Sequence, residues 1–115
     1  MVKQLEFWLE GIIEDDPIPE EIDILLFKVH KNGLYKYLEL NGYEKEINNN
    51  SVTYYPLEAQ FFNCKELAQL GDNLFYIRAK NIIEEAFSSS VLQQQLKGRK
   101  IFFQYGDRID FLFRV

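Results

Sequence analysis

The sequence has little of the chemistry that most catalytic sites need. Its 115 residues include one cysteine, Cys64, and one histidine, His30. A lone cysteine cannot close an internal disulfide, and a zinc site would have to be completed by carboxylates. Neither the G-x-G-x-x-G nor the G-x-x-x-x-G-K-[ST] phosphate-binding motif occurs. We therefore expect no cofactor and no bound metal.

Long apolar runs and an excess of positive charge are also missing. No apolar stretch approaches the roughly 20 residues that span a bilayer, and Glu6 and Glu10 interrupt the region where a signal peptide would be apolar. The net charge is −5, which opposes binding to nucleic acid and to anionic membranes. We expect a cytoplasmic protein that binds neither. The abundance of Ile, Lys, Asn, Glu, Phe and Tyr is typical of an AT-rich bacterial genome.

What the sequence does have is enough apolar material for a core. Hydrophobic residues make up 47% of the chain and aromatic residues 16%, which excludes a disordered protein. The length fits one core and is too short for two. Residues 1–115 are therefore expected to form a single domain.

The first half of the chain has the alternating pattern of β-strands. Residues 3–13 alternate as in a half-buried strand, with Trp8 on the polar side. Asn32-Gly33 predicts a hairpin between residues 22–31 and 34–40, in which Lys31 pairs with Leu34, and Asn41-Gly42 predicts a second turn. The two turns together predict a three-stranded meander. Its apolar face contains Leu25, Phe27, Val29, Leu34, Leu38 and Leu40.

The middle of the chain mixes extended and helical signals. Residues 48–51 are expected to form a loop and residues 53–62 an extended segment. Asn63 with Glu66 predicts a short helix over residues 64–70, and Asn81 with Glu84 predicts the start of a longer one over residues 81–97. Residues 88–90, all serine, favour a break in the longer helix. Residues 74–79 fit either a strand or a helix, and we favour a strand.

The last hairpin is predicted from its register. A three-residue loop at Gly106–Arg108 places the apolar residues of both strands on one face, whereas a two-residue loop would distribute them over both. The residues on that face are Ile101, Phe103, Tyr105, Ile109, Phe111, Phe113 and Val115. The fold class is therefore α+β: a mostly antiparallel sheet built from hairpins, with the helices at about 64–70 and 81–97 packed on one face.

Cys64 is the sharpest candidate for chemistry, because the start of a helix stabilises a thiolate. His30 is its only possible imidazole partner. A buried packing role is the commoner fate of a free cysteine, and we favour it. The acidic stretch at 14–23 lacks the ligand spacing and the central glycine of a calcium loop, so we interpret it as a solvated loop.

The other candidate is a sheet surface. The predicted strands bring aromatic and charged side chains to the face opposite the aliphatic residues, which is the composition of recognition surfaces. The candidate binding residues are Trp8, Lys28, His30, Tyr35, Tyr37, Glu39 and Glu44. The leading hypothesis is a non-enzymatic interaction or regulatory domain whose partner is another protein or a second copy of itself. The alternative is a small enzyme that uses Cys64 with His30, or a carboxylate pair, in a pocket between sheet and helix.

Overall fold

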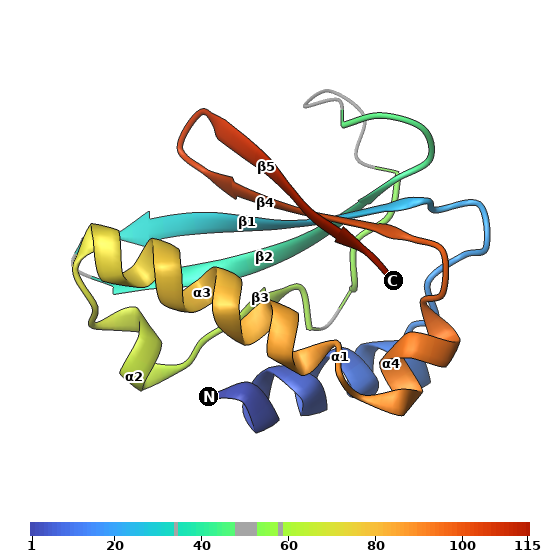
Figure 1. Ribbon diagram of the computed structural model, residues 1–115, viewed down its shortest axis with the longest axis horizontal. Helices are drawn as coiled ribbons and strands as arrows, with labels where there is room; N and C mark the ends of the chain where they lie inside the picture. Colours follow the sequence, from blue (N-terminus) through green and yellow to red (C-terminus); the bar gives the residue numbers. More distant parts are fainter. Residues whose placement is uncertain (34, 48–52, 58) are drawn as a thin grey trace.

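The protein has an α+β fold, as the sequence predicts, with one five-stranded, mostly antiparallel sheet and four helices (Figure 1). The computed structural model describes residues 1–33, 35–47, 53–57 and 59–115. The helices are α1 (Val2–Asp15), α2 (Lys65–Ala68), α3 (Asp72–Ala86) and α4 (Ser90–Gln95). The strands are β1 (Ile24–Asn32), β2 (Tyr35–Tyr43), β3 (Phe61–Phe62), β4 (Lys100–Tyr105) and β5 (Arg108–Arg114).

The sheet has the strand order β3-β2-β1-β4-β5. Only the central pair, β1 and β4, is parallel, and helices α2 to α4 lie on the connection between these strands. All four helices lie on the same side of the sheet, where α1 and α3 pack together (Figure 1). The main core is enclosed between this helical layer and the sheet. Within the described residues, no helix lies on the opposite face of the sheet.

The first element is a helix, so the predicted strand over residues 3–13 is wrong. The buried residues of α1 are Leu5, Leu9 and Ile12, at the i, i+4, i+7 spacing of a helix. Phe7, which a strand would bury together with Leu5 and Leu9, is 68% exposed. The apolar positions satisfy both periods, and packing of α1 against α3 selects the helix.

The hairpin at Asn32-Gly33 is confirmed, with a register two residues away from the predicted one. Asn32 pairs with Tyr35 and Lys31 with Lys36, and Gly33 lies in the turn with φ +62°. A shift of two residues leaves every side chain on the predicted face. The predicted apolar residues Leu25, Phe27, Val29, Leu38 and Leu40 are accordingly buried in the core. Leu34 and the predicted loop at 48–51 lie outside the described residues.

The second Asn-Gly pair is not a turn, because β2 continues through Asn41 and Gly42 to Tyr43. Gly42 instead allows a close approach: a Cβ atom there would lie 2.8 Å from the Ile22 Cγ2 atom and 3.1 Å from the Tyr54 Cβ atom. The predicted third strand of the meander is therefore wrong. The neighbour of β2 is the short strand β3, at the end of the segment predicted to be extended.

Helix α3 begins at Asp72, so the strand favoured for residues 74–79 is wrong. Asn81, predicted as a cap, lies inside this helix. The break at the serines is confirmed: the Ser89 hydroxyl accepts a hydrogen bond from the Leu92 amide and caps the separate helix α4. The buried residues of α3 recur at helical spacing through the predicted strand at 74–79 and the start of the predicted helix at 81–97. They are Phe75, Ala79, Ile82, Ile83 and Ala86.

The C-terminal hairpin has a two-residue loop, Gly106-Asp107, in place of the predicted three-residue loop. Gly106 adopts φ +62°, which suits the first position of a tight hairpin turn. The two-residue loop turns Phe111 away from the helices, where it is 55% exposed. A bulge opposite Ile101 and Phe102 then returns Phe113 to the core side. The prediction that Phe111 belongs to the core is therefore wrong.

Candidate functional site

The sheet face that no helix covers is the most distinctive surface of the molecule (Figure 1). Cross-strand register decides which side chains share it, since directly paired residues point to the same side. We call it the open face. It contains Lys28, His30, Tyr35, Tyr37, Glu39, Phe61, Gln104, Ile109 and Phe111.

An aromatic cluster occupies one half of the open face. The His30 imidazole stacks on the ring of its cross-strand partner Tyr37, with centroids 5.3 Å apart and planes at 16°. The Phe61 ring meets both rings edge-on, at 5.5 Å from Tyr37 and 6.2 Å from His30. Three strands therefore hold these rings in one fixed arrangement.

Glu39 orders the polar groups around this cluster. One of its carboxylate oxygens lies 2.7 Å from the His30 Nε2 atom and accepts a hydrogen bond from the Asn41 amide at 3.3 Å. The other accepts a hydrogen bond of 2.6 Å from the Gln60 amide. A carboxylate with these partners stays in place on the surface, where it can orient an incoming donor.

The second half of the open face is apolar. Phe111 packs edge-on against Phe102, with ring centroids 5.3 Å apart, and Ile109 lies two residues away on the same strand and face. Both side chains are exposed, as are Tyr35 and Phe61 in the first half. Isolated exposed apolar residues are ordinary, but four large apolar or aromatic side chains share this face of the sheet, two in each half.

Gln104 lies between the two halves, paired with Lys28 on β1 and with Ile109 on β5. It is 7% exposed, and its amide nitrogen donates to the Gly106 carbonyl at 3.1 Å. Its Oε1 atom is the one buried side-chain oxygen or nitrogen of the described residues that has no hydrogen-bond partner. A buried acceptor without a donor costs about 1–3 kcal/mol.

The far end of the sheet on this side is already covered. Ile24, Leu26 and Tyr43 form a small buried cluster there, and Ile47, which follows β2, packs against it together with Phe102. The exposed part of the open face is therefore the part nearer the two hairpin turns, where His30, Tyr37 and Gln104 lie.

The structure brings five of the seven predicted binding residues onto the open face: Lys28, His30, Tyr35, Tyr37 and Glu39. Trp8 is on the other side of the sheet, because the residues predicted to form its strand form helix α1. It packs on Phe27 and Phe62 and donates to the Ala59 carbonyl at 2.7 Å. Glu44 lies beyond the end of β2 and is exposed.

Sequence reasoning missed part of this surface. Phe61, Gln104, Ile109 and Phe111 join it through strand neighbours that are far away in the chain. A two-residue loop in the last hairpin puts Ile109 and Phe111 on the face opposite Phe103. Predicting that loop would have placed Ile109 and Phe111 on the open face.

Cys64 and His30 have different partners in the structure. The thiol of Cys64 is buried and donates to the Glu66 carboxylate at 3.0 Å and to the Gln4 side-chain oxygen at 3.3 Å. Burial, followed by the nearby Glu66, raises the pKa of the thiol. His30 contacts Glu39, as described above. A raised pKa lowers the thiolate fraction at neutral pH, which is the reverse of what a nucleophile needs.

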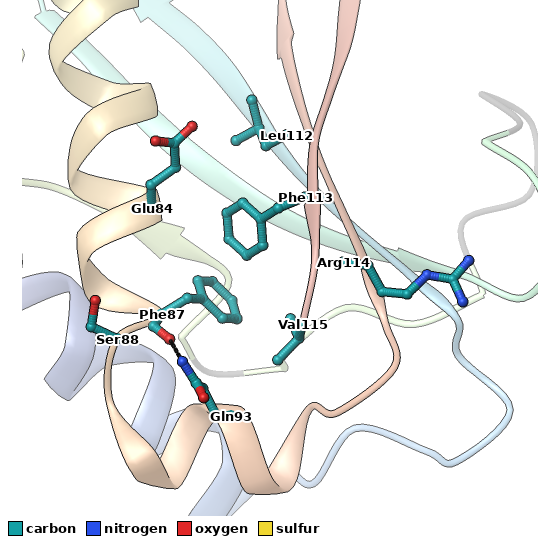
Figure 2. Close-up of a pocket in the computed structure, with 8 residues that line it drawn as sticks. All are labelled: Glu84, Phe87, Ser88, Gln93, Leu112, Phe113, Arg114 and Val115. Atoms are coloured by element: carbon teal, nitrogen blue, oxygen red, sulfur yellow. Dashed lines mark hydrogen bonds between the residues drawn. The ribbon is translucent and has the colours of Figure 1, made fainter.

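A pocket of about 600 Å³ lies between β5 and helices α3 and α4 (Figure 2). The Phe87 and Phe113 rings line it and contact each other edge-on, with centroids 5.2 Å apart. The Gln93 side-chain amide donates to the Phe87 carbonyl at 2.9 Å. Glu84 is the one lining residue with a carboxylate side chain. This pocket between sheet and helices therefore contains neither the cysteine–histidine pair nor a carboxylate pair.

Among the described residues, no group of three histidine, cysteine or acidic side chains is close enough to hold a metal ion. Within the same residues, no helix has the length and apolar character to cross a membrane. Comparisons with protein-family models, with curated proteins and with solved structures found no match to this chain.

Proposed function

We propose that this protein is a non-enzymatic cytoplasmic interaction domain that binds another protein, or a second copy of itself, through the open face. The observation that carries the proposal is the combination of exposed aromatic rings with polar groups already held in place. Tyrosine and other aromatic residues beside a few oriented polar groups are typical of binding hot spots.

The arrangement of the open face supports this role over a purely structural one. The His30, Tyr37 and Phe61 rings fix one another, so a partner that binds them immobilises few side chains and loses little entropy. Lys28 and Glu39, paired across β1 and β2, provide charges of both signs for specificity.

The experiment compares two alanine variants that are matched in exposure. Tyr35 on the open face is 58% exposed and Leu74 on α3 is 59% exposed. We expect Tyr35→Ala to weaken association at least tenfold, with a melting temperature close to that of the wild type, and Leu74→Ala to leave association unchanged. Association is measured by sedimentation for self-association and by retention of a co-purified protein on the immobilised wild type.

Phe61→Ala is the second variant, because it removes a ring that contacts both His30 and Tyr37. The proposal would be contradicted if the wild type, Tyr35→Ala and Phe61→Ala all retained the same proteins and all had the same mass in solution. Equal loss of retention in Leu74→Ala would contradict it as well, since the binding surface would then be on the helical side.

A further inference from the structure

A second concave site lies on the flank of α1, where that helix meets Pro56, Leu57 and Ala59. Its volume is about 530 Å³, within the range of small-molecule pockets. None of its lining residues belongs to the open face. They are Phe7, Trp8, Gly11, Ile12, Asp15, Asp16, Pro56, Leu57 and Ala59.

The walls of this pocket carry unusually exposed apolar side chains. Leu57 is 77% exposed and Phe7 is 68% exposed, the two largest values among the large apolar residues of the described chain. Both line the same pocket, with Trp8 and Ile12 beside them. An apolar ligand seated there would remove this surface from water, which favours binding.

Gly11 leaves the helix backbone bare at the pocket. A glycine inside a helix destabilises it relative to alanine. Nothing within the protein requires glycine here, because an added Cβ atom would meet no heavy atom within 4 Å. The missing side chain instead widens the pocket down to the helix itself.

The rim of the pocket is acidic. Helix α1 ends with Glu14 and Asp15, followed by Asp16, and its last turn has no basic residue. The partial negative charge of the helix C-terminus adds to these carboxylates, and none of the three forms an ion pair within the described residues. Asp16 is held in place, since its carboxylate accepts from the Leu57 amide at 2.8 Å and its carbonyl from the Tyr54 hydroxyl at 2.7 Å.

We propose that this pocket binds a small amphiphilic amine, with its apolar part over Gly11 between Phe7 and Leu57 and its ammonium group at Asp15 and Asp16. Apolar walls with one charged rim select such a ligand over a neutral or anionic one of the same shape. The site is separate from the open face, so it stands or fails independently of the proposed interaction function.

The chain supplies its own reporter for the test. Trp8 is the only tryptophan and it lines the pocket, so its fluorescence reports on occupancy. The probes are octylamine, octanol and octanoate near neutral pH, which share one apolar chain and differ in charge. We expect octylamine to bind at least tenfold more tightly than octanoate, with octanol between them.

Variants distinguish this site from adventitious binding. Gly11→Leu fills the pocket and should weaken octylamine binding at least tenfold. Phe7→Ala and Leu57→Ala, which truncate exposed side chains, should each weaken it severalfold and serve if Gly11→Leu does not fold. Asp15→Asn should remove most of the preference for the amine over octanol, whereas Asp107→Asn, in the exposed β4–β5 turn, should leave it unchanged.

Three results would overturn the proposal. The first is a Trp8 emission that none of the probes changes, and the second is octanoate binding as tight as that of octylamine. The third is a dimeric wild type that Gly11→Leu converts to a monomer, because the occupant of the pocket would then be a second copy of the chain.

Discussion

Tyr54 lies directly against the α-carbon of Gly42. The two residues also exchange backbone hydrogen bonds, from the Gly42 amide to the Tyr54 carbonyl at 2.7 Å and from the Tyr54 amide to the Gly42 carbonyl at 3.2 Å. This pairing continues the sheet beyond the short strand β3 and holds the end of β2. Any side chain at position 42 would have to displace the Tyr54 ring or Ile22.

We therefore expect Gly42→Ala to destabilise the protein by about 1–3 kcal/mol, the usual cost of overpacking. The matched control is Gly11→Ala, the same chemical change at an open helical position, which should raise stability by up to about 1 kcal/mol. Urea unfolding of the two variants measures both effects. Equal midpoints would mean that the contact between Gly42 and Tyr54 does not constrain the fold.

Truncation of a side chain should lower the free energy of unfolding much more on one face of the C-terminal hairpin than on the other. Phe103 is fully buried in the main core, and Phe111 is on the open face. We expect Phe103→Ala to cost about 3–5 kcal/mol and Phe111→Ala less than about 1 kcal/mol. Denaturant unfolding of the two variants is the measurement, and a larger loss in Phe111→Ala would contradict the two-residue turn.

Tyr54 should make stability fall in alkaline solution. Burial, with a smaller contribution from Asp16, raises the pKa of its hydroxyl to about 12 from an ordinary value of 10.0. Because the folded state holds the proton more tightly, the stability that this group contributes is complete below pH 10 and is lost as pH rises toward 12.

The test is the unfolding free energy of wild type and Tyr54→Phe across that pH range. The difference between the two should shrink as pH rises, since the variant has no proton to lose there. At neutral pH the variant should be less stable by about 0.5–1.5 kcal/mol, the net value of the hydrogen bond from the hydroxyl to the Asp16 carbonyl. A constant difference up to pH 12 would show that Tyr54 is not protected in the fold.

Cys64 should react slowly in the native protein. Its thiol is buried, its pKa is raised, and it donates to Glu66. As the only cysteine, it can be followed by labelling with a thiol reagent near pH 7. We expect labelling much slower than in the urea-unfolded chain. Native labelling faster than that of the unfolded chain would favour the alternative in which Cys64 is a nucleophile.

The residue pattern was sufficient for the fold class and for the first hairpin. Alternation in residues 27–31 and 35–40 gathers the aliphatic side chains on one face, and a register shift of two residues does not change that face. Five of the predicted binding residues therefore lie on the open face, although His30 pairs with Tyr37 and not with Tyr35 as the predicted register requires. The serine break was equally local, because capping needs only the residues at the helix start.

Tertiary structure decided what the local pattern left open. Residues 3–13 carry apolar side chains that fit a strand or a helix, and contact with α3 selects the helix and removes Trp8 from the predicted site. Gly42 is compatible with a turn or with the close approach of another segment, and its pairing with Tyr54 selects the close approach. Phe61, Gln104 and Phe111 reach the open face through pairing between strands far apart in the chain. Local sequence determines period and face, whereas the choice between two compatible periods depends on which distant segment supplies the buried contact.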